Sequence, residues 1–106
     1  MGGYIGKILR VNLTEKTIKT ESLNLELAKK YLSGRGLAGK MFTAEVPANV
    51  KAFSAENKVF IAAGTLTGTS APTSGRFMVV TKSPLNGTIA ASNSGGFWGP
   101  QLKFAG

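Results

Sequence analysis

The chain of 106 residues contains no cysteine, no histidine and no aspartate, and its only acidic residues are five glutamates. Without thiols and imidazoles there is no disulfide framework, and the usual thiolate and imidazole ligands of zinc are missing. Ser-His-Asp and Cys-His catalytic groups are excluded for the same reason. The glutamates fall in or beside predicted turns and helices, so no general base is evident. Catalysis by the side chains of this chain alone is therefore not expected.

The sequence also lacks any long apolar run. No segment approaches the ~20 apolar residues of a transmembrane helix. The first residues, MGGYIGKILRVNL, have no apolar run of signal-peptide length. We therefore expect a cytoplasmic protein that does not enter a membrane. The length predicts a single domain over residues 1–106, or part of one.

Positive charge, by contrast, is abundant. Thirteen lysines and arginines against five glutamates give a formal net charge of +8. Such an excess favours an anionic partner, and a basic nucleic-acid-binding module is one class of protein that fits. The ten lysines are spread along the whole chain, however, which is typical of a solubilising surface. Nucleic acid is therefore the less favoured partner, because its binding requires a contiguous basic face.

Glycine is frequent as well, with 14 residues. Gly34, Gly36 and Gly39 match the G-x-G-x-x-G motif of dinucleotide-binding proteins, in which the glycines follow a strand and open a helix. Here apolar residues at helical spacing predict a helix over residues 25–33, directly before the glycines. The same spacing predicts a second helical segment from about Gly36 to Glu45. We therefore interpret Gly34 and Gly36 as the break between two helical segments rather than as a phosphate-binding loop.

Strand patterns occupy much of the remaining chain. Alternating apolar residues, one continuous apolar run and the intervening turns predict five strands, over residues 4–13, 18–22, 58–63, 76–82 and 88–92. We predict an α+β fold, mostly antiparallel β-sheet, with the helical segment of about residues 25–45 on one face. A doubly wound α/β fold would require strands and helices to alternate regularly, which they do not between Lys58 and Ser92.

Two loops of small residues flank the last predicted hairpin, TLTGTSAPTSG over residues 65–75 and NSGGFWGP over residues 93–100. If Ser83–Gly87 is the hairpin loop, Arg76 lies opposite Ser94, and the two loops emerge side by side. Backbone N–H groups of such loops can form an anion-binding nest, and arginine offers a planar fork to phosphate. This arrangement predicts an anion or cofactor-phosphate site. The alternative is two ordinary polar loops and a solvated arginine, with Phe97 and Trp98 in the core or an interface.

At these residues the chain resembles the N-terminal domain of the aldehyde ferredoxin oxidoreductase family. Five blocks carry the resemblance, in order and at matching spacing: GKILRVNLTEKTIK, YLSGRGLAGK, ENKVFIAAGTLTGTSAPTSGRF, VVTKSPLNGTI and SNSGGFWGPQLKFAG. The family's enzymes hold tungsten (or molybdenum) between two pterin dithiolenes, beside a 4Fe–4S cluster. They oxidise aldehydes to carboxylic acids with ferredoxin as the acceptor. Their N-terminal domain is a β-rich base that cradles the bis-pterin cofactor.

The resemblance also implies roles for individual residues. Arg76 matches an arginine between the pterin and the cluster. Asn93 matches an asparagine whose backbone carbonyl binds a magnesium ion that bridges the pterin phosphates, and Gly95 matches a glycine against the pterin. With Ser94, Gly96 and the loop over residues 67–75, these residues form the half-site for pterin phosphate that we predict.

Members of the family are several times longer than this chain, and their cluster cysteines come later in the sequence. We therefore expect a fragment whose partner is the remainder of the enzyme chain, while ferredoxin and the aldehyde are partners of the parent enzyme. The 106 residues alone should not catalyse aldehyde oxidation. The alternatives to a cofactor-binding part are the nucleic-acid-binding module and a structural or assembly role. In the latter an open sheet edge could pair with another chain, including a second copy in a homo-oligomer.

Overall fold

Two antiparallel sheets and three helices make up residues 3–106, the part of the chain that the computed structural model describes. A hairpin forms the first sheet, and three strands in the order β3-β4-β5 form the second. The elements in chain order are β1 (Lys7–Asn12), β2 (Thr17–Ser22), α1 (Leu25–Tyr31), α2 (Gly34–Glu45), β3 (Phe60–Ala63), β4 (Phe77–Lys82), β5 (Ile89–Ser94) and α3 (Trp98–Phe104). The predicted α+β fold is confirmed.

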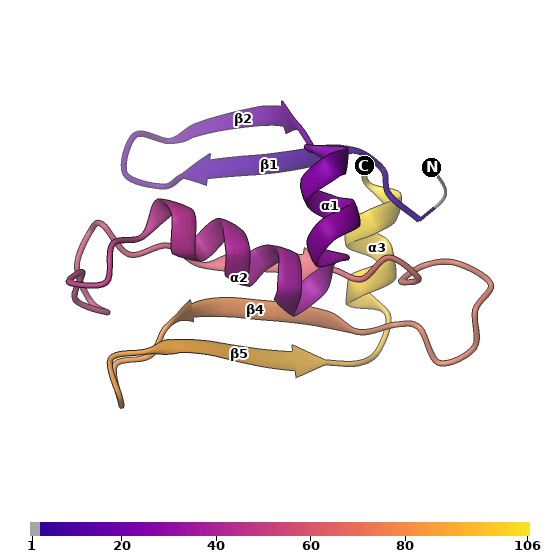
Figure 1. The fold of residues 1–106 in the computed structure, drawn as a ribbon. Coiled ribbons are helices and arrows are strands. Elements are labelled where there is room, and N and C mark those ends of the chain that lie inside the picture. Colours follow the sequence, from indigo (N-terminus) through magenta and orange to yellow (C-terminus); the bar gives the residue numbers. More distant parts are fainter. Residues whose placement is uncertain (1–2) are drawn as a thin grey trace.

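Helix α2 lies between the two sheets, with the β1–β2 hairpin on one side and the strands β3, β4 and β5 on the other (Figure 1). Ala38 and Phe42 of α2, with Val46 directly after the helix, pack onto Val80 of β4, whose side chain is fully buried. Phe42 meets Phe60 of β3 edge to face, with ring centroids 6.1 Å apart. This contact forms the core, and it places the predicted helical segment on one face of the main sheet.

Glycines cause the break between α1 and α2, as predicted. Gly34 has a left-handed φ of +55°, and a Cβ on Gly36 would lie 2.5 Å from the carbonyl oxygen of Tyr31. Only glycine fits where the two helices approach so closely. The interpretation of this motif as a break is confirmed, although α2 begins at Gly34 itself rather than at about Gly36.

Ion pairs join the first hairpin to α2. The guanidinium of Arg10 on β1 donates to both carboxylate oxygens of Glu45, at 2.6 and 3.1 Å, and also forms an ion pair with Glu21 of β2. Lys58 adds a third contact to Glu45, at 2.9 Å. These cations hold the pKa of Glu45 below its ordinary value, with the hydrogen bond from Arg10 as the largest cause.

Helix α3 lies where we expected only a loop, so the prediction for residues 93–100 is wrong. Gly99 and Pro100 ordinarily end helices, but Pro100 is the third residue of α3, where a backbone N–H has no partner within the helix. The ring of Trp98 packs against Phe77 of β4, with centroids 4.6 Å apart. This contact attaches α3 to the end of the sheet where β4 begins.

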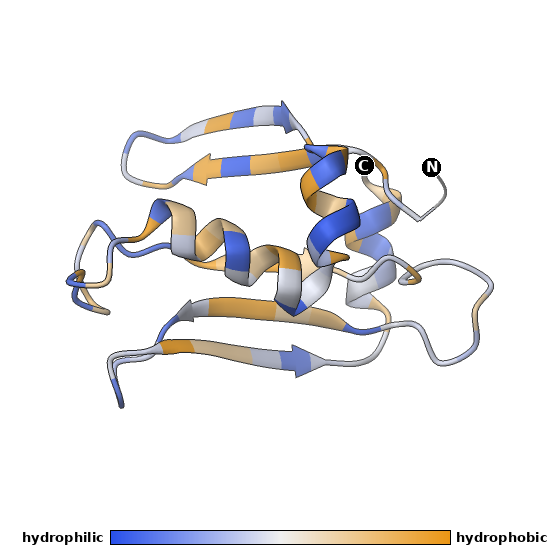
Figure 2. Cartoon of the chain, viewed as in Figure 1, coloured by the Kyte–Doolittle hydropathy of each residue, from blue (hydrophilic) through white to orange (hydrophobic). Residues whose placement is uncertain are grey.

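Much apolar surface remains exposed. On the outer face of the first hairpin, Leu9, Val11 and Ile18 are each more than half exposed, and Figure 2 shows apolar colour along β1. Phe97 beside α3 is 87% exposed. Within residues 3–106, none of the helices has both the length and the apolar character that crossing a bilayer requires.

The ion pairs of Glu45 predict a pH dependence of stability. Because the pKa of Glu45 is lowered in the folded state, its contribution is complete above the ordinary value of 4.5 and is lost as the pH falls below it. We expect Glu45→Gln to destabilise the fold by about 1 kcal/mol at pH 7. This difference should shrink as the pH approaches 3, and thermal unfolding monitored by circular dichroism between pH 7 and 3 measures it.

The matched control is Glu56→Gln, which removes an exposed glutamate without an ion pair in the described part of the chain. Its unfolding curve should follow that of the parent chain. If the two variants have equal stability at pH 7, Glu45 does not secure the hairpin.

Candidate functional site

The register of the β4–β5 hairpin differs by one residue from the expected one. Ser83 belongs to the ladder, because its N–H donates to the carbonyl of Thr88 at 2.8 Å, and this shortens the loop. Phe77 is therefore the Cα partner of Ser94, and Met78 is the partner of Asn93. The prediction that Arg76 lies opposite Ser94 is wrong. A slip of one residue exchanges the faces of a strand, so it changes which side chains meet.

The corrected register brings Arg76 and Asn93 to the same face of the sheet. Residues 76 and 78 point to one side of the strand, and the partner of Met78 points there too. A guanidinium N–H of Arg76 accordingly donates a short hydrogen bond to the side-chain oxygen of Asn93. Val80 shares this face and packs on α2, so the pair lies on the side of the sheet that the helix covers.

A buried hydroxyl fixes the backbone at Arg76. The last Cα pair of β3 and β4 is Ala63 with Phe77, and the next pair in that register would be Gly64 with Arg76. The Thr67 hydroxyl lies between them instead: it accepts from the Gly64 N–H at 2.9 Å and donates to the Arg76 carbonyl at 2.8 Å. Thr67 is only 4% exposed. Its side chain therefore separates the two strands where the loop over residues 65–75 begins.

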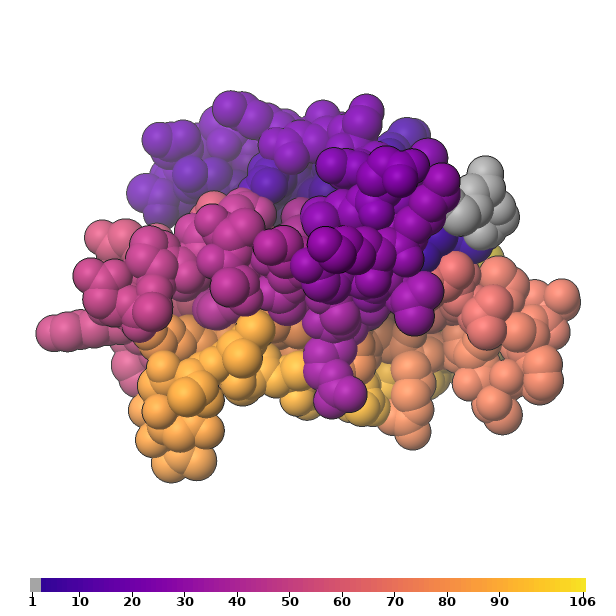
Figure 3. All heavy atoms as spheres, in the orientation of Figure 1, coloured from indigo at the N-terminus to yellow at the C-terminus, as the bar shows by residue number. Residues whose placement is uncertain are grey.

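The two small-residue loops cross closely beside this hydroxyl. A Cβ on Gly75 would lie 2.5 Å from the carbonyl oxygen of Gly96, and one on Gly99 would lie 2.9 Å from that of Gly75. By contrast, a Cβ on Gly95 would meet nothing within 4 Å, and the same holds for Gly96. The loops thus lie side by side, as predicted, with open space in front of Gly95 and Gly96. In Figure 3 the first loop projects at one end of the molecule, far from the β4–β5 turn.

Further residues that the sequence did not single out hold this loop in place. Lys103 of α3 donates to the carbonyls of Gly64 and Thr65, at 2.8 and 2.7 Å, and its burial lowers its pKa. The Ser33 hydroxyl accepts from the N–H of Thr65 at 2.8 Å. Threonine, serine and lysine are common in surface loops, so no local pattern marks these roles. The contacts depend on how α1, α3 and β3 are packed.

The edge of β5 leaves the backbone of Asn93 free to bind a partner. Opposed pairs in an antiparallel ladder alternate between hydrogen-bonded and non-hydrogen-bonded positions. Counting in steps of two from the bonded pair Ser83 and Thr88, the pair of Met78 and Asn93 is a non-bonded one. The carbonyl of Asn93 therefore points away from β4, and β5 is an edge strand of this sheet. Such a carbonyl is a suitable oxygen ligand for magnesium.

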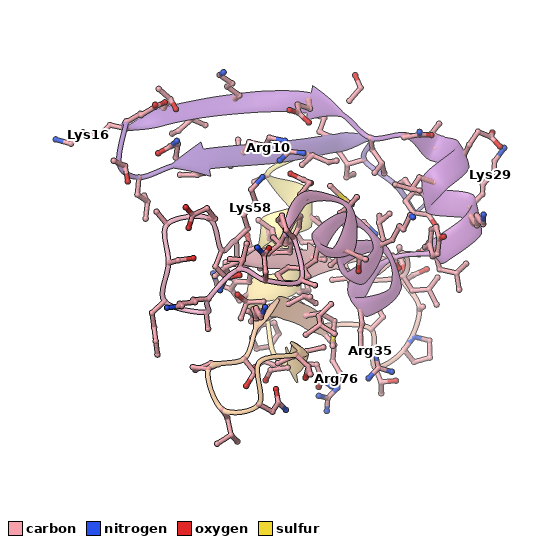
Figure 4. The ribbon with its side chains drawn as sticks, turned by 60° about the vertical axis from the view of Figure 1, so that its left-hand side comes forward. Arg10, Lys16, Lys29, Arg35, Lys58 and Arg76 are labelled. Atoms are coloured by element: carbon pink, nitrogen blue, oxygen red, sulfur yellow. The ribbon has the colours of Figure 1, made fainter. Side chains whose placement is uncertain are left out.

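The site carries unneutralised positive charge. In residues 3–106 the cations of the ion pairs are Arg10, Lys29 and Lys58, and no carboxylate pairs with Arg76. The labelled cations in Figure 4 point in several directions, with Lys16 and Lys29 at opposite ends of the view. These cations therefore do not form one continuous basic face. The guanidinium of Arg76, unpaired within residues 3–106, suits an anionic group rather than a metal ion by itself.

Protein ligands for a metal cluster are missing from this site. The sequence has no cysteine, and within residues 3–106 no three acidic side chains gather into a possible metal site. A 4Fe–4S cluster is usually held by four cysteine thiolates, and this chain has no cysteine to supply them. What the residues can offer is a guanidinium, an edge carbonyl and an open glycine surface.

This fold and sequence define a class of domain. Residues 8–106 match the family described as aldehyde ferredoxin oxidoreductase, N-terminal domain, and the chain belongs to this family. The resemblance noted in the sequence is thereby confirmed.

The relatives in this family are tungsten enzymes and related oxidoreductases. The chain is 59% identical to the tungsten-containing aldehyde ferredoxin oxidoreductase of Pyrococcus abyssi and 56% identical to that of Pyrococcus furiosus, each over the whole chain. It spans only 18% of the length of either relative. It is also 33% identical to an aliphatic sulfonate oxidoreductase, WOR-like subunit, of Pyrococcus furiosus.

A solved structure has the same fold. The active-site complex BamBC of benzoyl coenzyme A reductase, in complex with 1,5-dienoyl-CoA, matches 99% of this chain with a TM-score of 0.95 and 40% identity. The match takes up 16% of that chain. The α+β arrangement is thus that of an N-terminal portion of much larger proteins.

At two glycines of the loops, the same substitution to alanine should affect stability differently. Gly75→Ala places a methyl group against the carbonyl of Gly96, and we expect a loss of about 1–3 kcal/mol in the free energy of unfolding. Gly95→Ala adds a methyl group in open space, and stability should stay within about 0.5 kcal/mol of the parent value. Urea unfolding of both variants measures the difference, and equal stabilities would contradict the close crossing of the loops.

Proposed function

We propose that this domain is the cofactor-binding portion of a tungsten-dependent aldehyde:ferredoxin oxidoreductase, and that it holds phosphate of a bis-pterin cofactor. The observation that carries the proposal is the Arg76 guanidinium, bonded to the neutral amide of Asn93 beside the open Gly95–Gly96 surface. Arginine without a neighbouring carboxylate binds phosphate through charge-assisted hydrogen bonds. Ser94 and the loop over residues 67–75 lie beside the same corner of the domain, the place where β4 begins and the two loops cross.

The cofactor and the domain would divide the chemistry between them. When bound, the tungsten and its pterins supply the redox step, and the protein holds and orients them. Arg76 would neutralise phosphate charge, and the edge carbonyl of Asn93 would offer an oxygen ligand to a magnesium ion. Gly95 and Gly96 leave room for a flat pterin to approach the backbone, because neither has a side chain in the way.

The remainder of the enzyme chain is the partner that we propose for the exposed apolar surface. Leu9, Val11 and Ile18 on the first hairpin, and Phe97 beside α3, are more exposed than apolar side chains usually are in a complete enzyme. The relatives are more than five times as long as this chain, which supports the view that further parts of the enzyme cover this apolar surface. The cysteines of the 4Fe–4S cluster would come from that remainder.

An aldehyde is the substrate class that the similarity favours. The identity to tungsten-containing aldehyde ferredoxin oxidoreductases is 51–59%, against 33% to the aliphatic sulfonate oxidoreductase subunit. Arg76 lines neither the cavity at the loop of Phe53 nor the one between β1 and α2. The choice of aldehyde therefore belongs to the parts of the enzyme beyond this domain.

The proposal predicts that Arg76 retains the cofactor. In the complete enzyme that carries this domain, produced anaerobically with tungstate, Arg76→Ala should weaken cofactor retention by about 10- to 100-fold, the effect of removing one charged hydrogen bond. Tungsten per protein, pterin after extraction and iron per protein measure the effect. Tungsten and pterin should decrease together.

The matched control is Lys29→Ala, which removes an exposed cation whose one ion pair within residues 3–106 is with Glu26 on α1. Its tungsten and pterin contents should equal those of the parent enzyme, and both proteins should keep the same circular dichroism spectrum. If Arg76→Ala keeps its full tungsten and pterin through extensive dialysis, the phosphate site is not at Arg76.

A second prediction concerns the 106 residues by themselves, which should not oxidise aldehydes. They contain no cysteine and no histidine, no glutamate of residues 3–106 pairs with Arg76, and one arginine neutralises only part of the charge of two pterin phosphates. The chain expressed anaerobically with tungstate should contain little tungsten or iron and show no dye-linked aldehyde oxidation. Turnover with stoichiometric tungsten would contradict the proposal that this chain is only the cofactor-binding part of the enzyme.

A further inference from the structure

We propose that Arg35, in the first turn of α2, is a further guanidinium of the phosphate site and binds the same anionic group as Arg76. Neither the resemblance to the family nor the register of β4 and β5 assigns Arg35 a role. The inference rests on the proposed function for the identity of the ligand, a phosphate-bearing pterin.

The packing of α2 brings Arg35 to the corner of Arg76. A Cβ on Gly34 would lie 3.4 Å from Cγ of Met78, so the start of the helix rests directly on this side chain of β4. Met78 is the Cα partner of Asn93 and shares a sheet face with Arg76. Arg35 is the next residue after Gly34. Figure 4 shows the side chains of Arg35 and Arg76 projecting on the same side of the molecule, below the start of the helix.

Neither guanidinium is neutralised within the described part of the chain. The four ion pairs of residues 3–106 involve Arg10, Lys29 and Lys58, and none involves Arg35 or Arg76. The first turn of α2 contains no acidic residue. Two positive charges on one corner repel each other, and a group with two negative charges relieves that repulsion. Two planar forks also match the several oxygens of a phosphate better than one.

Nearby cations show what an ordinary surface charge does in this domain. Lys29 pairs with Glu26 at 3.1 Å, and Lys30 and Lys40 each lie over the ring of Tyr31, at 5.7 and 5.8 Å from its centroid. These three side chains find a partner on the two helices. Arg35 lies between them in the sequence but projects toward the corner of Arg76 (Figure 4), and residues 3–106 give it neither an ion pair nor a cation–π contact.

The test uses the complete enzyme that carries this domain, purified anaerobically after growth with tungstate. We expect Arg35→Ala to lose tungsten and pterin together about tenfold faster than the parent enzyme during dialysis, with an unchanged melting temperature of the cofactor-free protein. Arg35→Lys keeps the charge without the fork and should lose them at an intermediate rate. Lys29→Ala is the matched control, since it removes an exposed helical cation, and it should retain the cofactor.

The outcomes separate this inference from the function on which it rests. If Arg76→Ala releases tungsten and pterin but Arg35→Ala retains both at the parent rate, Arg35 is outside the site and the proposed function stands. If neither variant releases them, the phosphate site itself is elsewhere. Joint release from Arg35→Ala and Arg76→Ala, with retention in Lys29→Ala, supports two guanidiniums on one anionic group.

Discussion

Helix α2 has to fit two sheets at once, and the rest of the structure depends on this fit. On its apolar side Phe42 packs against Val80 of the three-stranded sheet. At its C-terminal end the carboxylate of Glu45 accepts hydrogen bonds from Arg10 of the first hairpin. The two contacts fix the position of α2 between the sheets and the direction of its axis. Because its first residue, Gly34, then rests on Met78, the start of α2 lies beside the corner where β4 begins.

That corner is shaped by small groups more than by large ones. The hydroxyl of Thr67 replaces a direct backbone contact between Gly64 and Arg76, and so it opens the sheet into the loop that follows. The absence of a Cβ at Gly75 lets the second loop cross the first at close range. The outcome is a guanidinium held at a defined place beside open backbone. Such a surface suits a flat, charged cofactor that needs positioning and neutralisation.

Most of the fold was predictable because local patterns agreed with it. Alternation and helical spacing identified both hairpins and both early helices, and in the structure Asn24 caps α1 by accepting from the N–H groups of Glu26 and Leu27. The register of β4 and β5 was not predictable, since it depends on one hydrogen bond of Ser83 that decides the loop length. Helix α3 was missed because Gly99 and Pro100 ordinarily signal a helix end, although Gly99 serves the loop crossing and Pro100 fits a first turn.

The sequence by itself determined that this chain brings no cysteine for a cluster and no histidine, since residue types that are absent remain absent in any fold. It also determined the local elements and, through the order of its motifs, the family. Only the tertiary structure decided that Arg76 meets Asn93 and that Arg35 lies at the same corner. The physical reason is that side chains alternate between the two faces of a strand, so a one-residue change in pairing exchanges every neighbour while local propensities stay the same.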